Sequence, residues 1–320
     1  MAKGLTVSID GGATSTDLLL LQRSLSSGVI VSGKGSNPNV TGKDCLDELD
    51  RLIHKATLVL GVSRDDVDEV VAGMAGRGNP QNRLAFQEKL DILFPHAHIL
   101  QINDSELAHR GIWGTNAGIT ILSGTGSVGI GTDEKGHIYF TGGLGHKIGD
   151  EGSGYWLVKT ALMELITKER SLNDDDIQLR NALVKHFGFN DYEELLTELS
   201  GDETPPPVIA SGTPVILNAA ENGNMVANHL VRRGADYLAD LIIELYEKMN
   251  KQKGELKLGC TGSVIKKSLF YRKCMEISLS YEFNSVEWVV SAYLPVYGGL
   301  VLSSSNYTPV DFEHIEVQFV

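Results

Sequence analysis

Two segments of this 320-residue chain repeat one arrangement, in which an apolar strand, a glycine-rich turn and a second strand follow one another. The first has strands at 5–10 and 17–21 around the turn GGATST, and the second has strands at 118–122 and 128–132 around the turn SGTGS. A third strand follows each pair, at 29–33 and 137–141. Because the copies lie about one domain's length apart, the pattern predicts a duplicated fold.

The glycine turns concentrate backbone N–H groups and small hydroxyls, which suits the binding of phosphate oxygens. Asp10 ends the first strand beside such a turn, where a carboxylate can hold a magnesium ion through water. A plain hairpin explains the first turn equally well. A third turn, GCTGSV at 259–264, joins a strand to a helix whose N-terminus would favour a flat or anionic ligand, although a simple connection is as good an explanation.

The segment 142–156, GGLGHKIGDEGSGYW, is the densest in glycine and precedes a helix. Ordering so many glycines is entropically costly, which indicates a backbone that approaches a ligand closely or adopts positive φ angles. The adjacent acids Asp150 and Glu151 have the chemistry of sugar-hydroxyl or metal recognition. The alternative is an ordinary long surface loop.

Together these motifs resemble the sugar-kinase and actin-like ATPase superfamily and, within it, the N-acetylglucosamine kinase/BadF-BadG ATPase family. The resemblance implies an α/β fold of two ribonuclease H-like (actin-like ATPase) domains, with a duplicated βββαβαβα core around a central cleft. We expect an N-terminal domain at 1–115 and a C-terminal domain at 116–320 with a helical insertion near 153–250. The segments that carry the resemblance are IDGGATST (9–16), INDSELA (102–108), ILSGTGSVG (121–129), GGLGHKIGDEGSGYW (142–156) and CTGSV (260–264).

Apolar periodicity supports alternating helices and strands in the rest of the chain. Segment 172–207 contains DDD and PPP runs and is interpreted as an insertion of short helices, with the acidic run at a helix start. Helices are predicted at 45–60, 81–93, 106–113, 153–167 and 225–249, and strands within 67–76 and 96–103.

The net charge of −13 argues against a nucleic-acid partner and would repel an anionic substrate at long range. Cys45, Cys260 and Cys274 form no close pair, which favours a reducing cytoplasm and argues against a bridging iron–sulfur cluster. No apolar run is long enough to span a bilayer and no N-terminal signal pattern is present, so we expect a soluble cytoplasmic protein with no membrane partner. The sequence leaves open whether the protein forms a homodimer.

Asp104 follows a strand and precedes a helix, where a carboxylate serves either as a helix cap or as a catalytic group. The resemblance implies that it is the general base of a kinase that uses ATP and Mg²⁺. Asp10 would organise the metal through water. The resemblance places nucleotide-binding residues at Asp10, Gly11, Gly12, Thr14, Gly124, Thr125, Gly126, Gly262 and Ser263.

The resemblance also implies that Asn39, Gly145, His146 and Asp150 bind the sugar. Asn37 competes with Asn39, and His146 is equally consistent with a structural role. Relatives often carry tryptophan where Leu144 stands, so the specificity for the acyl group is open. The predicted reaction is ATP-dependent phosphorylation of an amino sugar, foremost N-acetylglucosamine at its 6-hydroxyl. Alternatives are a glucosamine or N-acetylmuramic acid kinase, or an ATPase that drives a partner protein.

Overall fold

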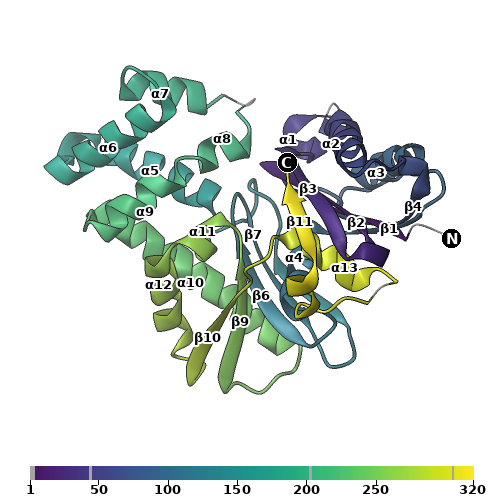
Figure 1. Cartoon of the computed structure of the whole chain (residues 1–320). Helices are drawn as coiled ribbons and strands as arrows, with labels where there is room; N and C mark the ends of the chain where they lie inside the picture. Colours follow the sequence, from purple (N-terminus) through teal and green to yellow (C-terminus); the bar gives the residue numbers. More distant parts are fainter. Residues whose placement is uncertain (1–3, 43–44, 202–203, 305) are drawn as a thin grey trace. The chain divides into compact units, whose positions relative to one another are not determined.

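The computed structural model describes residues 4–42, 45–201, 204–304 and 306–320. The chain divides into two compact units. The first comprises Met1–Ala117 and Ser291–Val320, and the second comprises Gly118–Val290. Figure 1 labels the helices and strands of both.

The first unit contains a six-stranded sheet with the order β11-β3-β2-β1-β4-β5. The first three strands of the chain form an antiparallel meander, whereas β4 and β5 join it in parallel. Its strands are β1 (Leu5–Gly11), β2 (Ser15–Gln22), β3 (Ser27–Lys34), β4 (Val67–Met74), β5 (His98–Ile102) and β11 (Glu316–Phe319).

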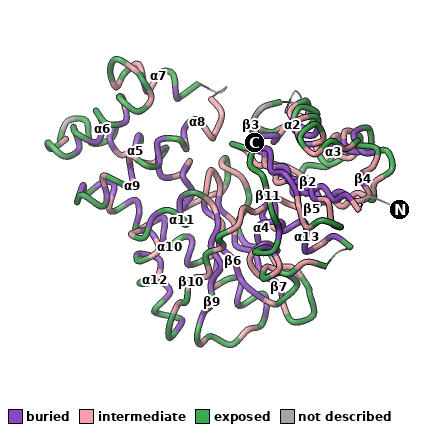
Figure 2. Tube along the Cα trace, viewed as in Figure 1, coloured by how far each residue is buried: buried purple, intermediate pink, exposed green. Residues whose placement is uncertain are grey.

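Helices cover both faces of this sheet, because successive side chains of β1 point to opposite faces and are buried on both. Leu5, Val7 and Ile9 are fully buried in one apolar cluster with α2 (Cys45–Leu60) and α3 (Pro80–Leu93). Ser8 points to the opposite face, where its hydroxyl donates to the Val296 carbonyl oxygen. That face is covered by α4 (Asp104–Trp113), η4 (Pro295–Tyr297) and α13 (Gly298–Leu302), and Figure 2 shows the strands as the buried centre of the unit. A short helix, α1 (Pro38–Thr41), precedes α2.

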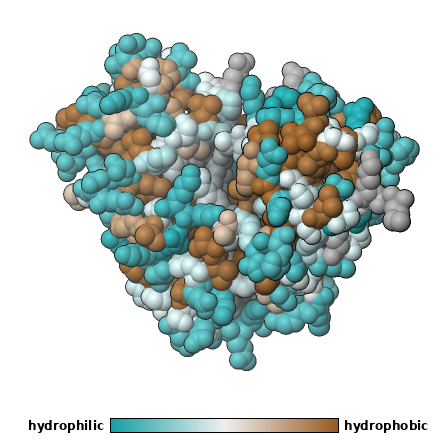
Figure 3. All heavy atoms as spheres, in the orientation of Figure 1, coloured by the Kyte–Doolittle hydropathy of each residue, from teal (hydrophilic) through white to brown (hydrophobic). Residues whose placement is uncertain are grey.

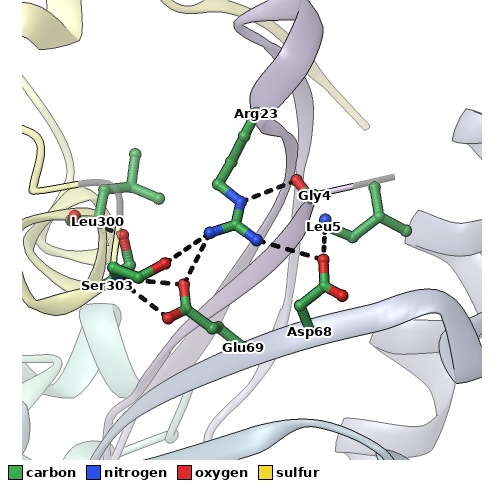
Figure 4. A network of polar contacts seen from close by, with 8 residues as sticks. Gly4, Leu5, Arg23, Asp68, Glu69, Leu300 and Ser303 are labelled. Atoms are coloured by element: carbon green, nitrogen blue, oxygen red, sulfur yellow. Dashed lines mark hydrogen bonds and ion pairs between the residues drawn. The ribbon is translucent and has the colours of Figure 1, made fainter. Parts of the chain in front are cut away.

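The C-terminal segment packs with the N-terminal residues, which differs from the expected division that assigned all of 116–320 to the second domain. Strand pairing and a network of polar contacts hold the C-terminal segment in the first unit. Strand β11 pairs in parallel with β3. Arg23 forms ion pairs with Asp68 at 3.2 Å and Glu69 at 3.1 Å, and Glu69 also accepts from the backbone N–H of Ser304 at 3.0 Å (Figure 4).

The second unit repeats the topology of the first. Its sheet order is β10-β9-β6-β7-β8, so the meander β6-β7-β8 corresponds to β1-β2-β3, and β9 and β10 correspond to β4 and β5. This confirms the predicted α/β fold with a duplicated core. The strands are β6 (Gly118–Ser123), β7 (Ser127–Thr132), β8 (Ile138–Gly142), β9 (Glu255–Thr261) and β10 (Ser285–Val290).

Helices inserted between β8 and β9 give the second unit its large apolar core, in which α10 packs on β7 and β8. The acidic run at 174–176 forms the first turn of α6, capped by the Asn173 side chain. The inserted helices are α5 (Gly154–Thr167), α6 (Asp174–Phe187), α7 (Tyr192–Leu199), α8 (Pro206–Ala210), α9 (Thr213–Glu221) and α10 (Met225–Lys248); α11 (Ser263–Lys267) and α12 (Leu269–Leu279) follow β9.

Among the described residues, no helix combines the length and apolar character that crossing a membrane requires. On the face shown in Figure 3, apolar residues form separate brown patches among teal polar ones.

Candidate active site

In the first unit, β1 ends in a tight turn that other segments of the same unit support. The N–H of Gly12 donates to the Ser15 carbonyl oxygen at 2.9 Å, and the Thr16 hydroxyl donates to the Ser36 hydroxyl at 2.8 Å. A β-carbon on Gly11 would lie 2.6 Å from Ser36 Oγ and 2.7 Å from Met74 Sδ. Packing within the unit therefore favours glycine at position 11, because a β-carbon there would displace the Ser36 and Met74 side chains. Thr14 is exposed.

Carboxylates gather at this edge of the sheet. Burial raises the pKa of Asp10 well above its ordinary value, and the negative charges of Asp104 and Asp17 raise it further. Burial also raises the pKa of Asp104, opposed by the Ser105 N–H, which donates to Asp104 Oδ1 at 2.8 Å. The structure thus brings together two residues predicted from separate motifs, Asp10 and Asp104, and adds Asp17, which faces Asp10 in the strand register.

The carboxylates at this edge are chemically compatible with a magnesium ion held through water, and the role of Asp10 in holding it stays a prediction. No group of three or more His, Cys, Asp or Glu side chains suited to a metal occurs in the part of the chain that the structure describes. Mg²⁺ does not need one, because it keeps several waters and is commonly held by one or two carboxylates together with substrate phosphates. A cation beside Asp10 would also relieve the repulsion among the three carboxylates.

The two asparagines proposed for sugar binding have different surroundings. Asn37 is buried, caps α1, and accepts from the Asn39 N–H at 3.0 Å. Asn39 is exposed, and its side-chain oxygen accepts from Asn82 Nδ2 at 2.8 Å. Both lie against Gly76, whose φ is +80° and whose added β-carbon would lie 2.4 Å from Asn37 Oδ1 and 3.0 Å from Asn39 Nδ2. The loop after β4 therefore packs against the segment that carries Asn37 and Asn39, a contact that the sequence analysis did not predict.

In the second unit, the turn SGTGS meets the glycine-rich loop. The Gly124 N–H donates to the Gly126 carbonyl oxygen at 2.9 Å, and the Gly124 carbonyl oxygen accepts from the Gly154 N–H at 2.8 Å. Asp150 Oδ1 accepts from the Ser127 N–H at 3.4 Å. A β-carbon on Gly126 would lie 2.8 Å from Asp150 Oδ2, so glycine leaves room for that carboxylate.

Asp150 has a left-handed backbone, with φ of +62°, and burial raises the pKa of its carboxyl group. The turn after β9 also reaches the SGTGS turn. Gly262 has φ of +89°, and its added β-carbon would lie 2.4 Å from the Ser123 carbonyl oxygen and 2.9 Å from the Gly124 nitrogen. Gly124, Gly126, Asp150 and Gly262 therefore share one neighbourhood, and Ser263 beside them is exposed.

The rest of the glycine-rich loop is more open. Gly145, with φ of +83°, closes a turn by accepting from the Gly149 N–H at 2.9 Å. His146 packs edge-on against Tyr155, with ring centroids 5.1 Å apart, and burial lowers its pKa although the charge of Asp150 opposes the shift. Leu144 is 69% exposed, so most of its side chain is accessible to solvent.

The sequence analysis also missed two charged residues near Asp104. Glu106, in the first turn of α4, has a pKa raised by burial, and the positive charges of Arg110 and Arg77 oppose the shift. Glu106 stands two positions after Asp104 in the INDSELA motif, which is a signal that could have drawn attention to it. Arg77 follows Gly76, and no motif indicated it.

The family model of the BadF/BadG/BcrA/BcrD ATPases matches residues 7–303, which includes every candidate residue described above. The chain belongs to this family. The chain is 25% identical over 306 residues to a Clostridium acetobutylicum protein named N-acetylmuramic acid/N-acetylglucosamine kinase, covering 94% of this chain and 98% of the relative. It is also 25% identical over 320 residues to N-acetyl-D-glucosamine kinase of Dictyostelium discoideum, covering 96% and 99%.

A solved structure supports the fold of this family member. A candidate N-acetylglucosamine kinase from Chromobacterium violaceum superimposes with a TM-score of 0.74 at 19% identity, covering 94% of this chain and 99% of that one. At this identity the likeness establishes the fold alone. It agrees with the duplicated strand order of the two units.

Proposed function

We propose that this BadF/BadG-type ATPase transfers the γ-phosphoryl group of ATP to an amino sugar, foremost to the 6-hydroxyl of N-acetylglucosamine. The observation that carries the proposal is that the carboxylates of Asp10 and Asp104 come close enough at one sheet edge of the first unit for the charge of Asp104 to raise the pKa of Asp10. One carboxylate can serve the metal and the other the acceptor. The names of the two curated relatives, each matched over nearly its whole length, support a sugar as the acceptor.

Asp104 would act as the general base. Its Oδ1 accepts from the Ser105 N–H, which fixes the carboxylate at the start of α4. Burial raises its pKa, which makes it a stronger proton acceptor than an exposed aspartate, provided the pH keeps it ionised. Phosphoryl transfer has a loose transition state, so this carboxylate chiefly orients the hydroxyl and takes its proton late.

The glycine turns would bind the nucleotide. Gly11, Gly12 and Thr14 form the turn after β1, and Gly124, Thr125 and Gly126 form its counterpart after β6. Gly262 and Ser263 would approach the adenosine. When bound, Mg²⁺ would neutralise charge on the phosphates, and Asp10 would orient its water ligands.

In the first unit, Asn39 or Asn37 is the residue that we propose to bind the sugar. Among the residues of the second unit, we propose this role for Gly145, His146 and Asp150. Asp150 is suited to this role because its carboxylate has an acceptor site beyond the Ser127 contact and can bind vicinal hydroxyls. His146 is largely neutral near pH 7, since burial lowers its pKa, so it can donate or accept a hydrogen bond. We place this activity in the cytoplasm.

The family description as ATPases keeps a second candidate open, an ATPase that couples hydrolysis to a partner protein. A screen of ATP consumption with glucose, glucosamine, N-acetylglucosamine and N-acetylmuramic acid separates the two functions. The kinase predicts ADP and phosphosugar in equal amounts with at least one amino sugar. The coupling ATPase predicts ADP without phosphosugar, and stimulation by a protein alone.

A further inference from the structure

The carbonyl oxygen of Gly152, in the glycine-rich loop, accepts two hydrogen bonds within the second unit. Ser123 Oγ, at the end of β6, donates to it at 2.9 Å, and the Tyr271 hydroxyl of α12 donates to it at 2.8 Å. Gly152, Ser123 and Tyr271 are all buried. A carbonyl oxygen has two lone pairs, so the two donors use its whole accepting capacity. Residues of two different elements therefore hold the loop at this one peptide group.

The packing around Tyr271 leaves room for its hydroxyl group. Gly234 lies inside α10, and a β-carbon added to it would lie 2.3 Å from the Tyr271 hydroxyl oxygen. Glycine in a helix interior is destabilising relative to alanine, so its presence there needs a physical reason. A β-carbon added to Gly152 would in turn lie 2.5 Å from the Gly234 carbonyl oxygen. The two glycines therefore allow the loop, α10 and the Tyr271 hydroxyl to meet at one point.

The peptide group that Tyr271 holds lies two residues after Asp150, the proposed sugar ligand. Asp150 and Gly152 both have left-handed backbones, with φ of +62° and +77°. The Ser153 N–H closes the turn between them by donating to the Asp150 carbonyl oxygen at 3.1 Å. Because the turn is this short, a shift of the Gly152 peptide group would also change the direction of the Asp150 side chain.

We propose that Tyr271 is a positioning residue for the acceptor sugar, whose hydroxyl sets the orientation of the Asp150 carboxylate through the Gly152 carbonyl oxygen. This inference rests on the proposed function. A carboxylate that binds a ligand must be held close to its productive geometry, and hydrogen bonds from supporting residues do this. Burial raises the pKa of Tyr271 well above its ordinary value, so its hydroxyl keeps its proton and remains a donor at neutral pH.

The test compares the steady-state kinetics of the wild type, Tyr271→Phe and Tyr192→Phe. The acceptor is the best substrate among glucose, glucosamine, N-acetylglucosamine and N-acetylmuramic acid. Tyr271→Phe keeps the ring and should raise the KM for the sugar about three- to tenfold, as expected for the loss of one supporting hydrogen bond, while the KM for ATP changes less than about twofold. Tyr192→Phe is the matched control, because Tyr192 also donates to a backbone carbonyl oxygen of the second unit, that of Leu162, at 3.1 Å. It should leave both KM values unchanged.

Ser123→Ala tests the same carbonyl oxygen from its other donor. It should also raise the KM for the sugar. The double variant Ser123→Ala/Tyr271→Phe should raise this KM by more than the product of the two single effects, because the buried carbonyl oxygen then has no donor. Effects that simply multiply would mean that the two hydroxyls do not act through the shared carbonyl oxygen, and would overturn the inference.

The outcomes separate this inference from the proposed function. If the wild type phosphorylates none of the four sugars, the proposed function fails and this inference fails with it. If the wild type is active, and folded Tyr271→Phe leaves the KM for the sugar unchanged or raises the KM values for sugar and ATP equally, the function stands and the role of Tyr271 is overturned. Circular dichroism identifies a misfolded Tyr271→Phe variant, in which case an unchanged KM for the sugar in Ser123→Ala overturns the inference.

Discussion

Alanine substitutions at two neighbouring glycines should separate ligand binding from folding. Gly262 has φ of +89° and ψ of 150°, a conformation almost confined to glycine, and its added β-carbon would lie 2.4 Å from the Ser123 carbonyl oxygen. A β-carbon on Gly124 would meet nothing closer than 3.7 Å, which is ordinary contact. Gly262→Ala is therefore expected to destabilise the second unit, and Gly124→Ala is not.

The magnitudes follow from the two geometries. Backbone strain of about 1–3 kcal/mol and a displaced carbonyl suggest that Gly262→Ala costs about 3 kcal/mol. For a unit of this size, that lowers Tm by about 6–12 °C. Gly124→Ala should change stability by less than about 0.5 kcal/mol. Its methyl group would hold a phosphate away from the turn, which we expect to raise the Kd for ATP about tenfold, or about 1.4 kcal/mol.

Thermal unfolding followed by circular dichroism, paired with ATP titration by calorimetry, measures both effects. Gly254→Ala is the matched control, because its β-carbon would meet nothing within 4 Å and its φ is not positive, so it should alter neither quantity. The reasoning is refuted if folded Gly124→Ala binds ATP as tightly as the wild type. It is also refuted if Gly124→Ala loses as much stability as Gly262→Ala.

Three further predictions address Asp104 and Asp10. Asp104→Asn should lower kcat about 10²-fold or more with both substrates saturating, because the amide cannot take the proton; an unchanged kcat would exclude Asp104 as base. In the wild type, kcat/KM should fall as pH decreases through the raised pKa of Asp104, so the acidic limb should lie above the ordinary range near 3.9, and a pH profile flat down to pH 4 would contradict this. Asp10→Asn should raise Tm at pH 7 in the absence of ligand. The reason is that a carboxyl group whose pKa is raised in the folded state destabilises the fold progressively as pH rises from its unfolded pKa to its folded pKa. The gain in Tm should vanish below about pH 3.5, and a variant less stable than the wild type at pH 7 would count against the carboxylate cluster.

Asp150→Asn tests the glycine-rich loop without changing its backbone, since asparagine tolerates the positive φ of +62° that alanine does not. Weaker hydrogen bonds to the sugar should raise its KM roughly tenfold and also lower kcat. Steady-state kinetics measure both, and sugar kinetics identical to the wild type would assign Asp150 a structural role only.

The duplicated fold was readable from the sequence because each copy repeats apolar strands around glycine turns. The helices at 45–60 and 225–249 were readable from their apolar spacing, and the structure places them at Cys45–Leu60 and Met225–Lys248. The association of 291–320 with the first unit was not readable. It depends on the pairing of β11 with β3 and on the Arg23 network, both of which join residues far apart in the chain.

Part of the candidate site could likewise be predicted from the sequence, and part could not. Local motifs indicated Asp10, Asp104 and Asp150, because each stands at the end of a strand or in a glycine-rich loop. Local pattern could not reveal that Gly76 lies against Asn37, or that the positive charge of Arg77 opposes the rise in the pKa of Glu106. Those relations arise only when the loop after β4 is folded beside α1 and α4.

The central claim is that this protein phosphorylates an amino sugar with Asp104 as the base. The most direct measurement is mass spectrometry of the sugar after reaction with ATP and Mg²⁺, together with ADP counted in the same sample, for the wild type and Asp104→Asn. The account predicts one phosphosugar per ADP in the wild type with N-acetylglucosamine or N-acetylmuramic acid, and at least a hundredfold less in Asp104→Asn. ADP formed at the same rate with and without sugar, and no phosphosugar, would contradict it.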